Sequence, residues 1–499
     1  MKYQSTRNSN LKLDSAQAIK IGIAPDGGLF VPVSIPKISD EKIASFAKLS
    51  YVEIANEILS LFLTDYTSEE LKDCTTNAYT KEKFETDEIA PVHKLNDNEY
   101  ILELWHGPTC AFKDMALQIL PHFLTKAIRK TGEEKDVIIL VATSGDTGKA
   151  ALEGFRDVPG TKIQVFYPRD GVSDIQKLQM TTQDGKNVNV SAVEGNFDDA
   201  QTGVKIIFSN DEFNKEANSL GYVFSSANSI NWGRLVPQIV YYFAAYAKML
   251  RDGYIKNGEK INITVPTGNF GNILAAYFAM EMGLKVNKLI CASNTNNVLS
   301  DFIKTGIYDK NRKFETTISP SMDILISSNL ERLLYLLSDR DDKKVAEYMS
   351  SLNKEGKYEI SSDIKEKLTS VFYGGYCDDN DTQKTIKSVY DKYSYTMDTH
   401  TAVAQNVYEN YVKETGDDTK TVIASTANPY KFNESVLSAI CPDISLDGKD
   451  EFELLDLLCE KSSLKIPNSL GLLKSKEVRF KNTCKKEALW DEVKNFLTK

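Results

Sequence analysis

The stretch Val137-Ile-Ile-Leu-Val-Ala-Thr-Ser-Gly-Asp-Thr-Gly-Lys149 joins an apolar run to a loop of small and hydroxyl-bearing residues. The apolar run is far shorter than the roughly 20 residues of a membrane helix and is typical of a buried strand. We expect a helix to begin near Gly148, with backbone N–H groups at its N-terminus available to an anion. The loop is not a P-loop, because that motif needs glycine in place of Thr143 and a hydroxyl residue in place of Ala150. The stretch therefore predicts a strand, a loop and a helix, and the loop is either an anion site or a plain N-cap by Ser144 or Asp146.

The same alternation of short β-branched runs and helical segments continues on both sides of this stretch. We expect strands at 100–104, 137–142, 162–167, 188–193, 222–225, 261–266, 288–292 and 421–424. We expect helices to begin near Asp114, Gly148, Ser173, Asp198, Trp232, Asn272 and Val298. Strands that alternate with helices indicate parallel βαβ units. The fold class predicted from this pattern is α/β.

The chain divides into three parts by composition and periodicity. Residues 1–90 are expected to form a small N-terminal domain, and residues 91–440 a larger α/β region. Within that region we expect a smaller subdomain at about 135–235. A charged, strand-poor stretch at about 330–400 is typical of a helical insertion. Residues 441–499 are expected to be a peripheral C-terminal segment.

Composition excludes several classes of protein. The net charge of −10 and the sequence pI near 5.3 argue against a nucleic-acid surface. The N-terminus has no apolar stretch after its charges, so a secretory signal is not expected, and the densest apolar run is too short to predict a membrane helix. The seven cysteines are scattered and the four histidines isolated, which favours the reducing cytoplasm and no metal site.

A single lysine stands between a turn and the start of a helix in the segment Gly107-Pro-Thr-Cys-Ala-Phe-Lys-Asp114. The positive end of the helix dipole disfavours an ammonium at Lys113, and the neighbouring Phe112 adds desolvation. A lysine becomes nucleophilic when its surroundings lower its pKa. Lys113 is therefore a candidate nucleophile, although most lysines near a helix start are solvated surface charges.

Three further loops follow predicted strands, where ligands of parallel sheets bind. Val265-Pro-Thr-Gly-Asn-Phe-Gly-Asn-Ile273 offers N–H groups and glycines suited to a phosphate monoester. Ser225-Ser-Ala-Asn-Ser-Ile-Asn-Trp-Gly-Arg234 offers hydroxyls, amides and an arginine for a second anion. Ser425-Thr426 offers hydroxyls able to bond a ring nitrogen. Together with Lys113, these loops predict a phosphate-bearing aldehyde cofactor held as a Schiff base.

These motifs closely resemble those of the threonine synthases, pyridoxal-phosphate lyases of the tryptophan-synthase-β fold type, in their longer bacterial and fungal branch. The resemblance extends from Tyr3-Gln-Ser-Thr-Arg7 to Lys431-Phe432 and includes Gly195-Asn-Phe-Asp-Asp-Ala200 and Asp398-Thr-His-Thr-Ala-Val403. It implies two mostly parallel, helix-covered sheets with pyridoxal 5'-phosphate in the cleft between them, plus the small N-terminal domain.

The resemblance also implies roles for individual residues. Lys113 is the implied catalytic residue and Schiff-base lysine. The other implied cofactor-binding residues are Phe112, Asp146, Gly268, Asn269, Phe270, Gly271, Asn272 and Thr426, with Ser425 the alternative to Thr426 at the pyridine nitrogen. The implied substrate-binding residues are Thr143, Ser144, Gly145, Thr147, Asn228, Ser229 and Arg234.

The implied activity is conversion of O-phospho-L-homoserine and water to L-threonine and phosphate, the last step of threonine biosynthesis, by a cytoplasmic monomer or homodimer. Two alternatives stay open. One is another lyase of the same fold, such as a serine or threonine deaminase, which has no need of the second phosphate site formed by Asn228, Ser229 and Arg234. The other is a non-catalytic, ligand-binding relative.

Overall fold

Two parallel-rich sheets organise the computed structural model, which describes residues 1–143, 145–169, 172–195, 197–462 and 464–499. The six-stranded sheet has the order β14 (Phe372–Tyr376), β11 (Val286–Ser293), β10 (Ile261–Pro266), β15 (Thr421–Ser425), β5 (Glu99–Glu103) and β4 (Val92–Lys94). The five-stranded sheet has the order β16 (Thr483–Lys485), β8 (Val188–Glu194), β7 (Thr161–Pro168), β6 (Asp136–Ala142) and β9 (Tyr222–Ser225). Among these strands only β4 pairs antiparallel with its neighbour. The predicted fold class, with two mostly parallel sheets, is confirmed.

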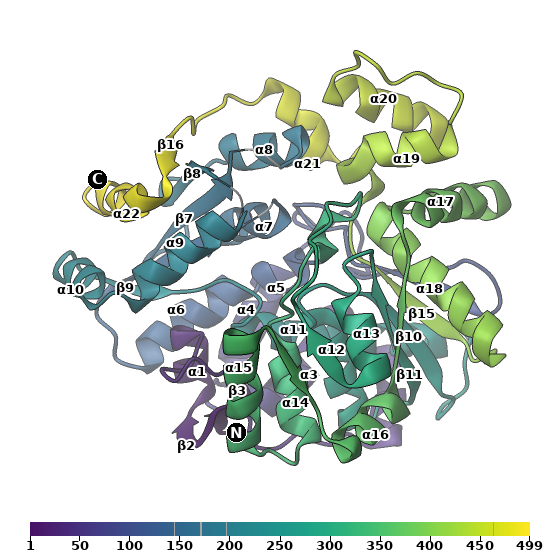
Figure 1. Ribbon diagram of the computed structural model, residues 1–499, viewed down its shortest axis with the longest axis horizontal. Coiled ribbons are helices and arrows are strands. Elements are labelled where there is room, and N and C mark those ends of the chain that lie inside the picture. Colours follow the sequence, from purple (N-terminus) through teal and green to yellow (C-terminus); the bar gives the residue numbers. More distant parts are fainter. Residues whose placement is uncertain (144, 170–171, 196, 463) are drawn as a thin grey trace.

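Helices flank both sheets (Figure 1). The five-stranded sheet carries α7 (Asp146–Phe155), α8 (Asp174–Thr181), α9 (Phe197–Ser209) and α10 (Asp211–Ser219). The six-stranded sheet carries α12 (Gly271–Met282), α13 (Val298–Thr305) and α18 (Thr399–Thr415). Between the sheets in sequence and in space run α5 (Asp114–Leu117), α6 (Leu120–Lys130) and α11 (Trp232–Arg251). None of the described helices combines the length and apolar character that a membrane span requires.

The N-terminal 90 residues form a three-stranded antiparallel sheet and four helices. Their elements are β1 (Tyr3–Ser5), β2 (Asn8–Leu13), α1 (Ser15–Ile21), β3 (Phe30–Pro32), α2 (Asp40–Ser45), α3 (Tyr51–Phe62) and α4 (Ser68–Ala78). Helix α3 begins at a capping box of Ser50 and Glu53 and buries Ile54, Ile58 and Phe62 on one face. That face joins the same hydrophobic core as α11. The N-terminal segment is thus attached to the rest of the molecule through a shared core.

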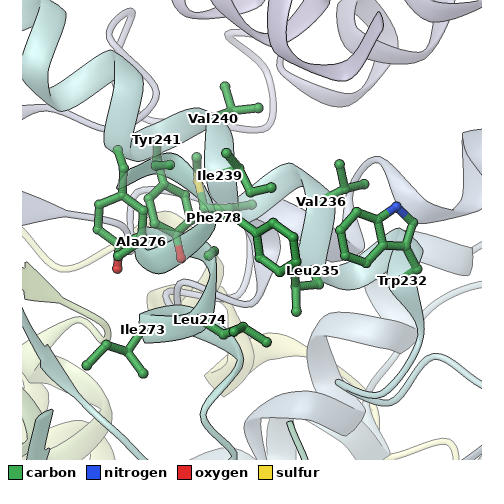
Figure 2. Packing of buried hydrophobic residues seen from close by; sticks show 14 of the residues in the cluster. Trp232, Leu235, Val236, Ile239, Val240, Tyr241, Ile273, Leu274, Ala276 and Phe278 are labelled. Atoms are coloured by element: carbon green, nitrogen blue, oxygen red, sulfur yellow. The ribbon is translucent and has the colours of Figure 1, made fainter. Parts of the chain in front are cut away.

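The first half of α11 packs against α12, as Figure 2 shows. The ring centroids of Trp232, at the start of α11, and Phe278, in the second half of α12, lie 5.4 Å apart. Farther along α11, the Tyr241 hydroxyl donates to Asn272 Oδ1 over 2.6 Å, at the start of α12. The two helices therefore run in opposite directions. Because each begins directly after a candidate ligand loop, their packing sets how far apart those loops lie.

The stretch 330–400 differs from the strand-poor insertion that its composition predicted. It contains α14 (Leu330–Leu337), α15 (Asp342–Glu355), α16 (Ser362–Val371) and α17 (Asp379–Tyr393), and β13 (Lys357–Glu359), which pairs with β12 (Ile307–Asp309). It also contains β14, the edge strand of the six-stranded sheet. Glycine lowers strand propensity, which hid β14 in the sequence. The structure uses those glycines for close packing: a Cβ on Gly374 would lie 3.0 Å from Ser300 of α13, and one on Gly375 would lie 2.6 Å from Val407 of α18.

The segment after residue 440 is also more integrated than a peripheral tail. After α19 (Asn433–Ile440), it forms α20 (Glu451–Ser462), α21 (Asn468–Gly471) and α22 (Leu489–Leu497). In Figure 1 it crosses from α20 to the opposite side of the molecule. There β16 pairs in parallel with β8 and becomes the edge of the five-stranded sheet. Three residues are too few for an alternating pattern to reveal this strand.

Candidate active site

Lys113 is a buried lysine at the N-cap of α5, 9% exposed. Its Nζ lies 3.4 Å from Asp146 Oδ2 and 5.0 Å from the centre of the Phe112 ring. Burial lowers the pKa of Lys113; Asp146 opposes this effect, while Lys431 and Arg234 add to it. A lowered pKa raises the fraction of neutral amine at neutral pH, and the neutral amine is the nucleophile.

Asp146, the first residue of α7, holds two lysines and a glutamine. Besides Lys113, it forms an ion pair with the fully buried Lys431 and accepts a hydrogen bond of 2.8 Å from Gln176. Burial alone would raise the pKa of Asp146, but the two lysines outweigh burial and lower it. Lys431 Nζ also donates to the Thr109 carbonyl over 3.1 Å. The sequence analysis gave no role to Lys431 or Gln176. The position of Lys431 in the hydroxyl-rich segment after β15 was the one feature of the sequence that indicated a role at the site.

The Lys113 segment is hydrogen-bonded to the segment that follows β15. The Phe112 N–H donates to the Thr426 carbonyl over 2.8 Å, and an isolated antiparallel bridge joins Ala111 to Ala427. Ser425 Oγ accepts from Trp105 Nε1 and Thr401 Oγ1, both over 2.9 Å. The Thr426 hydroxyl, in contrast, makes no hydrogen bond within the described part of the chain. This difference favours Thr426 over Ser425 as the hydroxyl available to a ligand.

The loop 267–271 presents N–H groups at the start of α12. The N–H groups of Asn269 and Phe270 donate to no residue that the structure describes. Phe270 has a left-handed backbone with φ 61°, a conformation that turns successive N–H groups into an anion-binding concavity. Gly268 is required sterically, since a Cβ there would lie 2.7 Å from the Ser321 carbonyl oxygen. Asn272 Nδ2 is buried without a partner among the described residues and is a further donor beside this cradle.

The loop after β6 is stabilised mainly by its own hydrogen bonds. Thr143 Oγ1 accepts from the N–H groups of Gly145, over 3.0 Å, and Gly148, over 2.9 Å. Helix α7 begins at Asp146 with Gly145 as its N-cap, two residues before the expected start at Gly148. Gly145 has φ 144°, and a Cβ there would lie 2.6 Å from the Gln176 side chain. Thr147 is half-buried, and Ser144 lies outside the described residues.

The loop 225–231 leads into Arg234 in the first turn of α11. The Arg234 side chain is buried, its Nη1 donates to the Ala227 carbonyl over 2.9 Å, and its Nε is buried without a hydrogen-bond partner among the described residues. Arg234 forms no ion pair with any residue that the structure describes. Burial lowers its pKa to about 10. Asn228 and Ser229 are half-buried, and their side chains make no hydrogen bonds within the described ranges, so all three groups are available to an anion.

The two candidate anion sites lie along one side of α11. Tyr241, which bonds Asn272 beside the cradle, stands seven residues after Arg234, or about 10 Å along the helix axis. The charge of Arg234 acts on Lys113, so the amine and the second anion site are close. The arrangement accommodates two separate phosphate groups with an amine near them.

Comparisons with known proteins identify the family to which the chain is similar. A threonine synthase N-terminal model matches residues 2–79, a pyridoxal-phosphate dependent enzyme model residues 86–360 and a threonine synthase C-terminal model residues 401–497. The threonine synthase of Saccharomyces cerevisiae is 37% identical over 466 residues, which cover 88% of this chain and 89% of that protein. The chain belongs to the threonine synthase family.

Two further relatives show how much of a related protein this chain spans. Threonine synthase-like 1 of Homo sapiens is 41% identical over 435 residues, or 85% of this chain, and the chain spans 58% of that protein's length. The crystal structure of PLP-bound threonine synthase from Brucella melitensis is 35% identical, covers 100% of both chains and superposes with a TM-score of 0.87. The fold therefore extends over the full length of a solved family member.

The residues present fit pyridoxal phosphate, the cofactor of this enzyme family. A buried lysine can reach an aldehyde, the 269–270 N–H groups and Asn272 Nδ2 can donate to a phosphate, and the Thr426 hydroxyl is available to a ring nitrogen. The N–H groups, the Asn272 amide and the Thr426 hydroxyl lack a partner among the described residues. Burial lowers the pKa of Lys113, which favours its nucleophilic form.

Proposed function

We propose that this chain is a threonine synthase, which converts O-phospho-L-homoserine and water to L-threonine and phosphate. The observation that carries the proposal is Arg234: a buried arginine without an ion-pair partner among the described residues, close enough to Lys113 to act on its pKa. A deaminase of the same fold has one phosphate to bind, that of the cofactor. A second anion site beside the amine supports a phosphorylated substrate.

We assign the cofactor contacts as follows. Lys113 holds the aldehyde carbon, with Phe112 beside it and Asp146 orienting the amine. The backbone of Gly268, Asn269, Phe270 and Gly271, together with the Asn272 amide, holds the phosphate, and Thr426 donates to the ring nitrogen. Pyridoxal phosphate, when bound, supplies an electron sink for charge that develops on the substrate carbons.

The side chains then move protons and stabilise charge. The neutral Lys113 amine is placed to remove the protons from Cα and Cβ in turn, and these protons return to Cγ and Cα as water supplies the Cβ hydroxyl of threonine. Arg234, Asn228 and Ser229 stabilise the negative charge on the departing phosphate, while Thr143, Gly145 and Thr147 line the substrate's path, with Ser144 assigned by resemblance alone. Lys431 and Gln176 hold Asp146 so that its carboxylate remains aimed at Lys113.

The decisive experiment is an assay of the purified chain with O-phospho-L-homoserine and added pyridoxal phosphate. We expect phosphate and L-threonine in equal amounts. Release of phosphate with ammonia in place of threonine would identify another lyase, and absence of any cofactor absorbance would identify a non-catalytic relative. Lys113→Ala is expected to abolish both products and the borohydride-reducible attachment of the cofactor. Lys149→Arg, at a buried lysine that pairs with Glu153, should retain them.

We also propose the setting in which the enzyme works. It acts in the cytoplasm on a small-molecule substrate, as a monomer or homodimer, without nucleic acid. Its organisation is an N-terminal domain (1–90), a catalytic region (91–440) and a C-terminal segment (441–499). Size-exclusion chromatography with light scattering distinguishes the two oligomeric states.

A further inference from the structure

Arg332, on α14, is a fully buried arginine that bonds three parts of the chain. Its Nε donates to the Phe30 carbonyl of β3 over 2.9 Å, and its Nη2 donates to the Ile230 carbonyl over 2.5 Å. Its Nη1 donates to the side-chain oxygen of Asn329, the N-cap of α14. Within the described residues Arg332 forms no ion pair, so its guanidinium is committed to backbone carbonyls and one amide.

Ile230 belongs to the loop 225–231, which carries the candidate phosphate ligands Asn228 and Ser229. Most other supports of this loop are local. Arg234 bonds the Ala227 carbonyl, Asn231 Nδ2 bonds the Ser226 carbonyl over 3.0 Å, and the Asn231 N–H bonds the Asn228 carbonyl over 3.1 Å. The bond from Arg332 to the Ile230 carbonyl comes from a distant part of the chain and lies next to Ser229 in sequence. Loss of this bond would loosen the loop at Ile230, beside the candidate phosphate ligands.

Asn329 holds the other candidate loop. Its backbone N–H and its Nδ2 both donate to the Asn269 carbonyl, over 3.2 and 3.0 Å, and Ser327 Oγ donates to the Gly268 carbonyl over 2.7 Å. In a planar trans peptide the N–H points away from the preceding C=O. Holding the carbonyls of Gly268 and Asn269 toward residues 327–329 therefore turns the N–H groups of Asn269 and Phe270 to the opposite side, as a phosphate cradle requires.

Arg332 and Asn329 thus connect the two candidate phosphate sites through their own hydrogen bond. The connection runs from the Ile230 carbonyl through the guanidinium and the Asn329 amide to the Asn269 carbonyl. Buried arginine is suited to this task because its planar fork bonds several acceptors at fixed angles. Loss of Arg332 would remove a donor from the Ile230 carbonyl and from the Asn329 side-chain oxygen, and loss of the Asn329 side chain would remove a donor from the Asn269 carbonyl and an acceptor from Arg332.

We propose that Arg332 and Asn329 are positioning residues that keep the substrate-phosphate loop and the cofactor-phosphate cradle in a fixed relation. This inference rests on the proposed function for its substrate arm. Through these two residues α14 influences both cofactor binding and substrate binding without itself contacting a ligand. Ser327, whose hydroxyl bonds the cradle and not the substrate-phosphate loop, controls the cofactor step alone.

The test compares Arg332→Met with Arg340→Met. Arg340 Nη1 donates to the Pro32 carbonyl of β3 over 2.9 Å, much as Arg332 bonds Phe30, but none of the bonds that the structure gives Arg340 reaches either loop. We expect Arg332→Met to raise both the KM for O-phospho-L-homoserine and the Kd for pyridoxal phosphate by roughly 10- to 100-fold, the scale of a small misplacement of reacting groups. Arg340→Met should leave both within about 2-fold, whatever its effect on the melting temperature.

Two further variants keep the test decisive if Arg332→Met does not fold. Asn329→Ala should raise both constants, and Ser327→Ala should raise the Kd for pyridoxal phosphate but not the KM. A folded Arg332→Met or Asn329→Ala protein with both constants within about 2-fold of the unmodified chain would overturn the inference. If the unmodified chain makes no threonine, the proposed function fails separately, and the Kd measurements still test the hold of Asn329 on the cradle.

Discussion

At Lys113 three influences lower the pKa of the amine and one raises it. Burial has the largest effect, Lys431 and Arg234 add like-charge repulsion, and Asp146 opposes them. Asp146 nevertheless has to be present, because it fixes the position of the amine at 3.4 Å. Lys113 must be neutral to act as a nucleophile, whereas the Asp146 carboxylate favours the charged form of Lys113. Lys431 relieves this conflict by forming its own ion pair with Asp146.

Replacing Lys431 is expected to change the pH dependence of cofactor attachment. Lys431→Met removes a positive charge and frees Asp146 for Lys113, and both changes raise the pKa of Lys113. The neutral fraction of the amine then falls at a given pH, so attachment of pyridoxal phosphate should slow at neutral pH and recover at higher pH. The rate of the absorbance change after cofactor addition, measured from pH 6 to 10, checks this. Lys431→Arg keeps the charge and serves as control; an unchanged profile for Lys431→Met would contradict the assignment.

Replacing Arg234 is expected to affect the substrate more than the cofactor. Arg234→Met removes a charge-assisted donor, a contact worth about 1.5–3 kcal/mol, so kcat/KM for O-phospho-L-homoserine should fall by roughly 10- to 100-fold. The Kd for pyridoxal phosphate should change little, because the cradle lies on α12. Steady-state kinetics and a cofactor titration of the same protein measure both quantities. Loss of the cofactor with intact substrate kinetics would refute the role given to Arg234.

At the scale of elements, the site is built where loops enter helices. Helices α7, α11 and α12 each begin directly after a candidate ligand loop, and each has first-turn N–H groups that donate to no residue that the structure describes. The antiparallel packing of α11 and α12 then separates two of these loops along one surface (Figure 2). Helix starts were predictable from the small residues that precede them, but this spacing was not.

The cradle should be sensitive to a methyl group at its first glycine. In Gly268→Ala the new Cβ would meet the Ser321 carbonyl oxygen at 2.7 Å, so the loop must shift away from residues 320–329. We expect the Kd for pyridoxal phosphate to rise by about 10-fold or more, because the displaced N–H groups no longer point at the phosphate. Absorbance titration measures this Kd. Gly471→Ala is the control, since its Cβ would meet nothing nearer than 3.6 Å. Equal cofactor affinity in both variants would place the phosphate elsewhere.

At the scale of the whole molecule, the N-terminal segment reaches the site through α14. Thr6 Oγ1 donates to Glu331 over 2.6 Å, and Arg7 donates to the same carboxylate through Nε and Nη2 over 2.8 and 2.7 Å. Glu331 stands next to Arg332 in α14. The motif Tyr3-Gln-Ser-Thr-Arg7, which resembles the family but has no chemistry of its own, thus anchors the helix that holds both loops.

Removing this anchor is expected to lower stability. Glu331→Ala removes a carboxylate whose side chain is only 6% exposed, and the three donors of Thr6 and Arg7 lose their acceptor. This loss should reduce the free energy of unfolding by about 1–3 kcal/mol. Glu315→Ala removes an exposed ion pair, with Lys313 82% and Glu315 41% exposed, and should cost less than about 1 kcal/mol. Urea unfolding of the three proteins measures the difference. Equal losses would show that the Thr6 and Arg7 contacts contribute no more than a surface pair.

The sequence alone determined the alternation of strands and helices, the family, and the segments that carry the candidate ligands, because these depend on local periodicity and on residue types at fixed spacing. It did not reveal β14 and β16, whose pairing depends on distant strands. It also gave no role to Lys431, Gln176, Asn329 and Arg332. Lys431 lies 285 positions from its partner Asp146, and Arg332 lies 102 positions from Ile230. Only the tertiary structure brings such residues within hydrogen-bond distance, and buried charges depend on those neighbours for both their position and their pKa.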